Sequence, residues 1–334
     1  MRLQPISVAA GLLLAAVSQF AWTQSPSPDE AVYRVSVRLV VVDAQVVEKK
    51  SGQAVRSLKQ EDFQVLEDGV PQQISSFSQD RLPLSVVLLF DLTDSVRPVL
   101  KKLAEGALEA LQHLKPEDEV AVMTYAASAE LIQDFTRDRA LAVAAIEKAS
   151  RMKSPEAAFF NEGIFQAATR LEQSPNRRVI IWLTDDVPNI PSEDLPLSVR
   201  RSVAMEKLHT QQDALQELFR TGTVVCALLK QSEESEAGYY RLMSKPVDRM
   251  LHPPGEVHKY AQATGGQVVE SSGKKMRDKL AGMIDDLRMR YSLGYRPSAQ
   301  NPKKKFCALK VKLSPTTLKS VGKVTIQARQ GYYR

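Results

Sequence analysis

Carboxyl and hydroxyl side chains gather at two short turns of this sequence. The first turn, Asp91-Leu92-Thr93-Asp94-Ser95, directly follows the apolar run 84–90. The second, Asp185-Asp186, directly follows the mostly apolar run 178–184. Since Asp91, Thr93 and Ser95 alternate, their oxygens can converge from one turn, and such oxygens are the ligands that Mg²⁺ and other hard cations prefer. The spacing therefore predicts a metal site, with Asp185 adding a second carboxylate.

Two other roles for these residues remain open on the sequence alone. Asp and Ser at a strand-to-helix turn often cap the helix, and Asp94 or Ser95 has that position here. An Asp after an apolar strand is also where haloacid-dehalogenase-like phosphohydrolases place their nucleophile. Those enzymes need a second Asp two residues later, where this chain has Thr93.

The elements that position these turns alternate between strand and helix over residues 84–291. The runs 84–90 and 178–184 are typical of strands buried on both faces. Helices are expected at 95–114, 139–150, 159–171, within 198–220, at 257–263 and at 274–291, and further strands at 119–125, 129–135, 223–229 and 267–270. This alternation predicts an α/β fold with a doubly wound, mostly parallel sheet, in which sites form beyond the carboxyl ends of the central strands.

Both ends of the chain have a β pattern instead. In the first, Val35, Val37, Leu39 and Val41 alternate with residues 36, 38 and 40, and Asp68-Gly69 forms a hairpin turn between strands 63–67 and 70–77. In the second, residues 306–313 and 323–330 alternate. We expect the two ends to form one small β-sandwich around the inserted α/β domain. The predicted divisions are a signal peptide (1–23), a flexible start (24–30), a β segment (31–80), the α/β domain (84–291) and a closing β segment (292–334).

The motifs above resemble the von Willebrand factor A-type (vWA) domain. The flanks resemble the bacterial VWFA-related (acidobacterial-type) family through Glu67-Asp68-Gly69, Tyr291-Ser292-Leu293-Gly294-Tyr295 and the end of the chain. The resemblance implies a vWA/Rossmann-like fold and a metal-ion-dependent adhesion site built from Asp91, Thr93, Ser95 and Asp185. It also implies a loop threonine as a ligand, but Ala157 stands at that position, and Ser154, Glu156 and Asn161 are the candidate substitutes. Asp186 replaces the glycine usual after the second Asp.

The remaining sequence features concern location and partners. Residues 6–17 are apolar and uncharged, which predicts export to a secreted or periplasmic location, with an uncleaved N-terminal anchor as the alternative. Cys226 and Cys307 could pair there, although the apolar surroundings of Cys226 favour a buried thiol. The four histidines have no ligand-like spacing. The C-terminal segment is basic, but its lysines alternate with apolar residues, as on the solvated face of a strand, so we expect no nucleic-acid partner.

These observations favour a binding module over an enzyme for this chain of 334 residues. By the resemblance, Mg²⁺ (or Mn²⁺ or Ca²⁺) would hold an acidic group of a protein or extracellular polymer. The chain would have no transmembrane segment after removal of the signal peptide. The alternatives are a Mg²⁺-dependent phosphohydrolase and a structural scaffold whose metal site is inactive because of Ala157.

Overall fold

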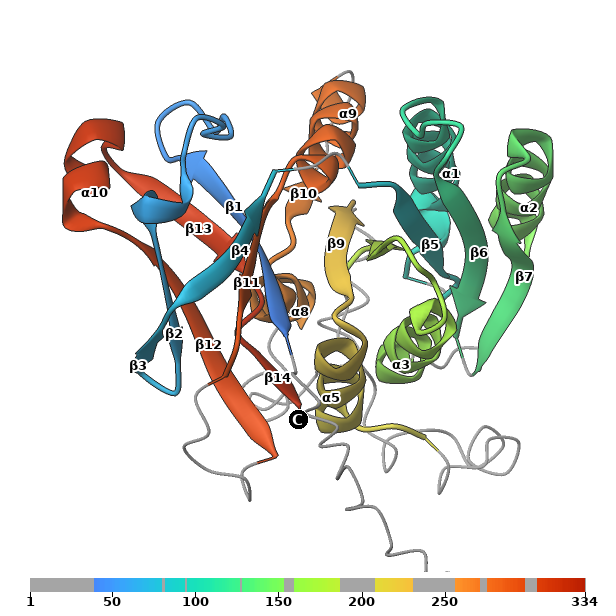
Figure 1. The fold of residues 1–334 in the computed structure, drawn as a ribbon. Coiled ribbons are helices and arrows are strands. Elements are labelled where there is room, and N and C mark those ends of the chain that lie inside the picture. Colours follow the sequence, from blue (N-terminus) through green and yellow to red (C-terminus); the bar gives the residue numbers. More distant parts are fainter. Residues whose placement is uncertain are drawn as a thin grey trace, which may run out of the picture. The chain divides into compact units, whose positions relative to one another are not determined.

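Three β-sheets organise the described part of the chain (Figure 1). The computed structural model describes residues 39–79, 82–93, 95–126, 128–152, 159–186, 208–230, 256–270, 275–297 and 305–333. Residues 38–334 form one compact unit. The predicted signal peptide, the flexible start, Asp94, Ser154, Glu156 and Ala157 lie outside the described residues.

The central sheet has six strands in the order β10-β9-β8-β5-β6-β7. Its strands pair in parallel except for β7, which is antiparallel to its neighbour β6 at one edge. Every residue of β5 is buried, as its apolar sequence predicts for a central strand covered on both faces. The strands are β5 (Leu84–Asp91), β6 (Glu119–Tyr125), β7 (Ala129–Thr136), β8 (Arg177–Thr184), β9 (Val224–Leu229) and β10 (Val268–Glu270).

Helices cover both faces of this sheet. On one face Val86, Leu88 and Phe90 of β5 pack in a core with α1 (Arg97–Gln112), α2 (Arg139–Arg151) and α9 (Lys275–Arg288). On the other face Val87 and Leu89 pack with α3 (Phe160–Leu171), α5 (Gln211–Thr221) and α8 (Glu256–Thr264). Alternate residues of one strand thus serve two separate cores. The predicted doubly wound α/β fold is confirmed.

Both chain ends build a sandwich of two four-stranded sheets, as predicted. One sheet has the order β13-β1-β11-β4 and the other β14-β12-β2-β3. Their facing residues, among them Val42, Val65, Leu293 and Val311, share one hydrophobic core. The elements are β1 (Val40–Glu48), the short 3-10 helix η1 (Gln60–Asp62), β2 (Phe63–Glu67), β3 (Val70–Gln72), β4 (Ile74–Ser78), β11 (Tyr291–Tyr295), β12 (Phe306–Leu313), α10 (Pro315–Val321), β13 (Val324–Ala328) and β14 (Gly331–Tyr333).

The predicted phase of the first strand is wrong. The structure buries Val40, Val42, Ala44 and Val46, whereas Leu39 and Val41 are 48% and 43% exposed. The run 39–42 is apolar at every position, so alternation there fits either phase. The polar residues Asp43 and Gln45 further along β1 fix the phase, because they share a face with Leu39 and Val41.

Two other boundaries differ from the sequence prediction. The last helix ends at Arg288 rather than at residue 291, and the next residues form β11 in the sandwich. The predicted return strand 70–77 divides into β3, which pairs with β2, and β4, which pairs with β11. Helical spacing cannot show where a chain leaves one domain to complete another, because that depends on pairing with distant strands.

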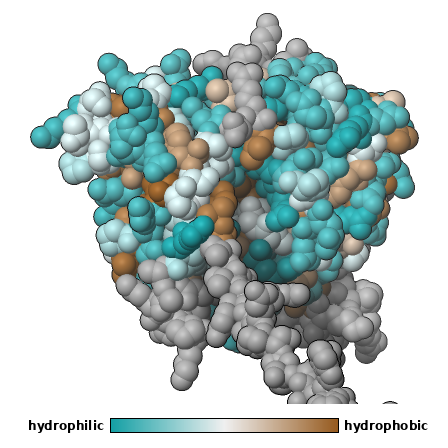
Figure 2. All heavy atoms as spheres, viewed as in Figure 1, coloured by the Kyte–Doolittle hydropathy of each residue, from teal (hydrophilic) through white to brown (hydrophobic). Residues whose placement is uncertain are grey.

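Several smaller predictions are borne out by burial. Cys226 and Cys307 are buried free thiols. Lys310 and Lys312 are exposed on β12 while their neighbours Leu309 and Val311 are buried, as expected for a solvated strand face. On the face seen in Figure 2, hydrophilic residues predominate and apolar ones form small groups. No helix within the described ranges has the length and hydrophobicity needed to cross a bilayer.

Candidate functional site

Asp91 is the centre of a hydrogen-bonded group at the carboxyl edge of the central sheet. It is the last residue of β5 and only 2% of it is exposed. Its Oδ1 accepts bonds from the backbone N–H of Thr93 at 2.9 Å and from the Thr93 hydroxyl at 2.7 Å. The carboxylate therefore fixes the turn that follows the strand, as an Asx-type turn does.

The other oxygen of Asp91 joins this strand to its two neighbours. Oδ2 accepts bonds from the hydroxyl of Tyr125, at the end of β6, at 2.7 Å and from that of Thr184, at the end of β8, at 2.8 Å. Trp182 Nε1 donates to the Tyr125 oxygen at 2.9 Å. The four donors thus come from three adjacent strand ends and hold the carboxylate in one orientation.

The structure brings the first predicted metal-site residues together. Thr93 Oγ1 and Ser95 Oγ lie 3.1 Å apart. Since the one hydroxyl hydrogen of Thr93 is donated to Asp91, Ser95 is the donor in that contact, and the Thr93 oxygen keeps one further lone pair. Asp185 follows Thr184 directly, at the same edge of the sheet, and is 1% exposed. All of these groups are hard oxygen donors, which is the chemistry that a Mg²⁺ or Ca²⁺ site requires.

Asp186 does more than add charge near this edge. Its backbone has a positive φ of 63°, in the left-handed region that favours glycine. Its Oδ1 accepts a bond from the backbone N–H of Val257, in the first turn of α8, at 3.1 Å. The carboxylate therefore satisfies one of the free N–H groups at a helix start, a contact that glycine could not make.

Burial dominates the electrostatics of the group. Burial raises the pKa of Asp91 above its ordinary value, although the hydrogen bonds from Tyr125, Thr93 and Thr184 act in the opposite direction. Burial and then the adjacent Asp91 charge raise the pKa of Tyr125 well above its ordinary value. Tyr125 is therefore a hydrogen-bond donor, not a titrating base, at neutral pH.

Of the proposed substitutes for the loop threonine, Asn161 lies within the described residues. It stands at the start of α3, and its Oδ1 accepts a hydrogen bond from the Tyr260 hydroxyl at 2.6 Å. In the described part of the chain, its side chain is thus joined to α8 rather than to the hydrogen-bonded group of Asp91.

Tyr125, Thr184 and Trp182 are residues of the site that the sequence reasoning did not assign. A signal was present, because Tyr125 and Thr184 end the strands on either side of β5 and carry hydroxyls. The space for the Tyr125 ring is made by Gly163 of α3, where a Cβ atom would lie 2.8 Å from Tyr125 Cγ. Phe160 and Tyr260 complete an aromatic cluster with Trp182 beneath the site.

A second acidic group in the sandwich has a structural role. Glu67, Asp68 and Cys307 bring possible ligand atoms within 4.8 Å of one another. However, Glu67 Oε2 accepts bonds from the hydroxyls of Tyr295 at 2.7 Å and Tyr332 at 3.1 Å, and Asp68 Oδ1 accepts from the backbone N–H of Ala308 at 3.0 Å. These bonds join strands of the sandwich, and we assign no metal to the group.

The sequence model of the von Willebrand factor type A domain matches residues 86–187. The matched segment begins in β5 and ends just after Asp186, so it includes both turns of the site. The chain carries a vWA domain. The resemblance inferred from the two motifs is thereby confirmed for the domain, while its assignment to the bacterial VWFA-related family stays a prediction.

The solved structures to which this chain is similar are distant in sequence. The conserved hypothetical protein BatB from Bacteroides thetaiotaomicron is 16% identical, with a TM-score of 0.42, over 61% of this chain and 98% of that one. The vWF domain of the type V pili tip protein Mfa5 from Porphyromonas gingivalis is 10% identical, with a TM-score of 0.39, over 61% and 96%. The PilB minor pilin from Streptococcus sanguinis is 13% identical, with a TM-score of 0.43, over 64% and 63%. Among curated proteins, none matches this sequence.

Proposed function

We propose that this chain is an exported binding module for a protein or extracellular polymer, and that its vWA domain holds a divalent cation at Thr93 and Ser95. One observation carries the proposal: the Thr93 hydroxyl donates to Asp91 while its oxygen lies 3.1 Å from Ser95 Oγ. Two neutral oxygens thus lie side by side. The buried carboxylate that accepts the Thr93 hydrogen increases the negative partial charge on the Thr93 oxygen, which favours binding of a cation.

Asp91 acts in this arrangement through the hydroxyls. Each of its oxygens already accepts two hydrogen bonds, about as many as a carboxylate oxygen has lone pairs for. Thr93 and Ser95 are therefore the proposed direct ligands, with Asp185 supplying negative charge from β8. When bound, Mg²⁺ or a similar cation supplies a positive centre that an acidic group of a partner can coordinate.

The same contacts argue against the phosphohydrolase alternative. A nucleophilic aspartate must reach a phosphorus atom with a free oxygen. Here the Asp91 carboxylate is 2% exposed, and Tyr125 and Thr184 donate to one oxygen while Thr93 donates twice to the other. The position of the required second Asp is occupied by Thr93, whose hydroxyl cannot replace a carboxyl group as a general acid or base at neutral pH.

Calorimetric titration of the purified protein tests the cation site directly. We expect saturable binding of Mg²⁺ or Mn²⁺ with a dissociation constant of about 1–10 mM. This is weaker than the roughly 0.1–1 mM with which extracellular modules bind Ca²⁺. Thr93→Val and Ser95→Ala should each weaken binding at least tenfold. Thr325→Val, at an exposed position on β13, is the matched loss of a hydroxyl and should bind like the wild type. Absence of binding by the folded wild-type protein would leave the scaffold alternative.

A second measurement tests the binding function. Polyglutamate is a probe that offers many carboxylates, and its retention on the immobilised protein should require the cation and disappear in EDTA. Thr93→Val should abolish retention. Retention that is equal with and without the cation would contradict the proposed role of the site.

Amino-terminal sequencing of protein recovered outside the cytoplasm tests export, with a new start near residue 24 as the expected result.

A further inference from the structure

A pocket of about 600 Å³ lies at the opposite edge of the central sheet from Asp91. Residues at the starts of three strands line it, namely Pro83 before β5, Arg177 and Arg178 in β8 and Val224 in β9, together with Asp43 of the sandwich. The eight residues of β5 span roughly 25 Å at about 3.3 Å per residue. The pocket is therefore separate from the proposed cation site, and its volume is in the range that small-molecule sites occupy.

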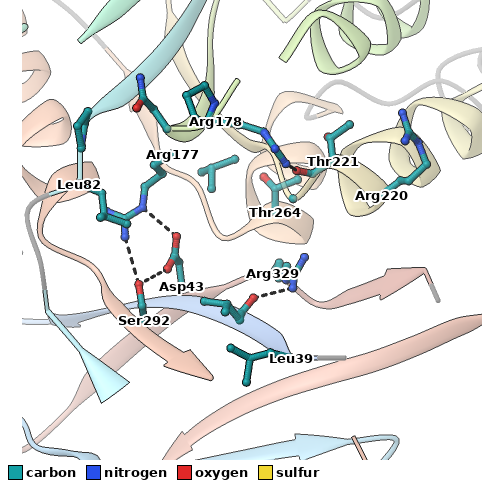
Figure 3. A pocket seen from close by; sticks show the side chains of 16 residues that line it. Leu39, Asp43, Leu82, Arg177, Arg178, Arg220, Thr221, Thr264, Ser292 and Arg329 are labelled. Atoms are coloured by element: carbon teal, nitrogen blue, oxygen red, sulfur yellow. Dashed lines mark hydrogen bonds and ion pairs between the residues drawn. The ribbon is translucent and has the colours of Figure 1, made fainter. Parts of the chain in front are cut away.

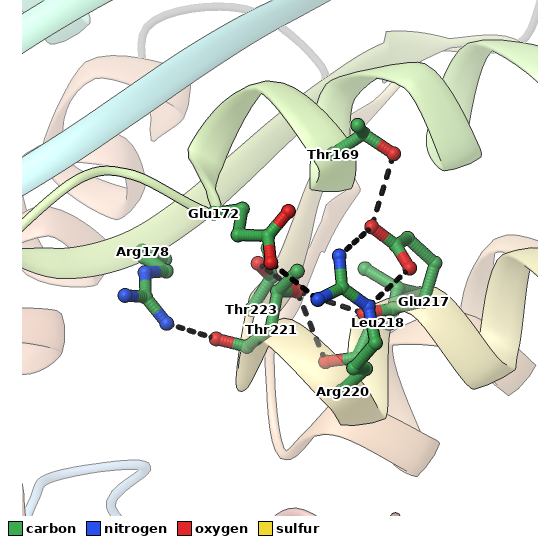
Figure 4. A network of polar contacts seen from close by, with 8 residues as sticks. All are labelled: Thr169, Glu172, Arg178, Glu217, Leu218, Arg220, Thr221 and Thr223. Carbon is green, nitrogen blue, oxygen red and sulfur yellow. Dashed lines mark hydrogen bonds and ion pairs between the residues drawn. The ribbon is translucent and has the colours of Figure 1, made fainter.

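Four arginines contribute to the lining, and two of them are neutralised by neighbouring carboxylates. Arg177 is paired with Asp43, with its Nε 2.8 Å from Oδ2, and Ser292 donates to the other carboxylate oxygen at 2.6 Å (Figure 3). Arg220 bonds both Glu172 and Glu217 (Figure 4). Because these two arginines are already paired with carboxylates, they support the pocket wall and are not the proposed ligand contacts.

The other two arginines, Arg178 and Arg329, have no carboxylate within 4.0 Å among the described residues. Arg178 donates to the carbonyls of Ser174 and Thr221, and Arg329 Nη2 donates to the Val41 carbonyl at 2.6 Å. Carbonyl groups orient a guanidinium but do not cancel its charge. Burial lowers the pKa of both groups below the ordinary arginine value, although the charge of Glu172 acts in the opposite direction on Arg178 and that of Asp43 on Arg329.

Two buried donor groups of the lining have no protein acceptor. Arg329 Nε and Asn176 Nδ2 are both buried, and neither has a hydrogen-bond partner in the described part of the chain. Burying a donor without an acceptor is costly, so such atoms indicate a group that supplies one. Two guanidinium groups without a directly paired carboxylate and two unused donors together favour a ligand group with several negatively charged oxygens.

The rim of the pocket is apolar. Leu39, Val41 and Leu82 line it and are 48%, 43% and 40% exposed, which places three of the large exposed hydrophobic residues of the described chain at one opening. Leu39 and Val41 are the residues that the unexpected phase of β1 turns outward. Figure 3 shows Leu39 and Arg329 on the same side of the pocket. A ligand that enters here therefore meets apolar side chains before the guanidinium groups.

We propose that this pocket binds a small organic anion whose carboxylate or phosphate group pairs with Arg178 and Arg329 and whose short apolar chain lies against Leu39, Val41 and Leu82. A guanidinium group can bond two oxygens of either anion at once, which gives the site its preference for planar or tetrahedral oxyanions. The carbonyl groups of Ser174 and Thr221 hold Arg178 in place, and that of Val41 holds Arg329.

Titration of the full-length protein with three probes of equal chain length tests the proposal. Hexanoate and hexyl phosphate carry the two candidate head groups, and hexanamide is the neutral control. We expect saturable, one-to-one binding of at least one anion, and at least tenfold weaker binding of hexanamide. The anion that binds more tightly identifies the head group. Equal binding of hexanamide, or no saturable binding of either anion, would overturn the proposal.

Variants locate the binding in this pocket. Arg329→Gln and Arg178→Gln should each weaken anion binding at least tenfold, and Leu82→Ser, at a site where loss of fold is not expected, should weaken it severalfold. Arg151→Gln removes an arginine whose side chain is 77% exposed and is the matched control. Gly222 also lines the pocket, so hydrogen exchange should slow at the peptide that contains it when the anion is added. Unchanged affinity in both Leu82→Ser and a folded Arg329→Gln would place the binding elsewhere. EDTA and Thr93→Val should leave it unaffected.

Discussion

The hydroxyl of Tyr125 donates to Asp91 Oδ2 at 2.7 Å while accepting a bond from Trp182 Nε1 at 2.9 Å. The three side chains come from the ends of β6, β5 and β8, so one chain of hydrogen bonds crosses the carboxyl edge of the sheet. Tyr125 therefore orients Asp91 without being available as a ligand itself, since its oxygen already has both partners. Thr93 and Ser95 are therefore the proposed cation ligands, whereas Tyr125 only positions Asp91 behind them.

Tyr125→Phe should lower stability and leave cation binding largely intact. The change removes one of four donors to a buried carboxylate and leaves the Trp182 N–H without an acceptor, at a cost of about 1–3 kcal/mol in the free energy of unfolding. Urea unfolding measures this, and the Mg²⁺ affinity should remain within about threefold of wild type, a change below about 1 kcal/mol. Loss of cation binding in the folded variant would mean that Tyr125 has a direct role at the metal.

Gly163→Ala should destabilise the protein although alanine is the better helix former. An added Cβ would lie 2.8 Å from Tyr125 Cγ, so the ring or α3 must shift, at about 1–3 kcal/mol. The matched control is Gly282→Ala in α9, where no atom lies within 4 Å of the added Cβ and where we expect a gain of about 0.5–1 kcal/mol. Thermal unfolding of both variants gives the comparison. Similar shifts in both would show that the contact with Tyr125 is relaxed at no cost.

Substitutions of Asp186 should separate its two contributions. Asp186→Asn keeps an acceptor for the Val257 N–H and tolerates the positive φ, so we expect a change below about 1 kcal/mol. Asp186→Gly loses the acceptor but suits the positive φ, so we expect a cost below about 0.5 kcal/mol. Asp186→Ala loses the acceptor and also adopts a left-handed backbone, at about 2–3 kcal/mol in total. Urea unfolding ranks the three, and an alanine variant more stable than the glycine variant would contradict this reasoning.

Asp43→Asn should destabilise the protein at neutral pH and less so in acid. Burial alone would raise the pKa of Asp43, but the charge of Arg177 and the bond from Ser292 outweigh it, and the folded-state pKa lies below the ordinary value of 3.8. A carboxyl group with a lowered pKa contributes its stabilisation above the unfolded-state pKa and loses it as the pH falls through the folded-state pKa.

The size of that effect follows from the burial of the partner. The Arg177 side chain is 3% exposed and that of Asp43 is 25% exposed, so removing the carboxylate charge leaves a buried guanidinium unpaired. We expect a loss of about 2–4 kcal/mol near pH 7 that shrinks toward about pH 2. Urea unfolding across this range is the measurement. A difference between wild type and variant that stays constant with pH would show that the pair is not the source of the stabilisation.

The sequence by itself determined the layers of this protein and the edge at which its site forms. Runs of apolar residues such as 84–90 can be buried only by covering both faces of a strand, and the order of strands and helices then leaves few folds. Because parallel strands end at the same edge, Asp91 and Asp185 were predicted to lie at one place. These conclusions depend on hydrophobic patterns within short segments, which can be recognised in the sequence alone.

The tertiary structure decided which side chains meet. Tyr125, Thr184 and Gly163 are distant from Asp91 in sequence, and only the pairing of β5 with β6 and β8 and the packing of α3 bring them into one group. The phase of β1 was likewise undecided in an all-apolar stretch until pairing with β11 and β13 placed Val40 and Val42 in the core. That choice turned Leu39 and Val41 outward, beside arginines contributed by β8 and by the end of β13. Contacts of this kind depend on register and packing between separate segments, for which a single sequence holds no local signal.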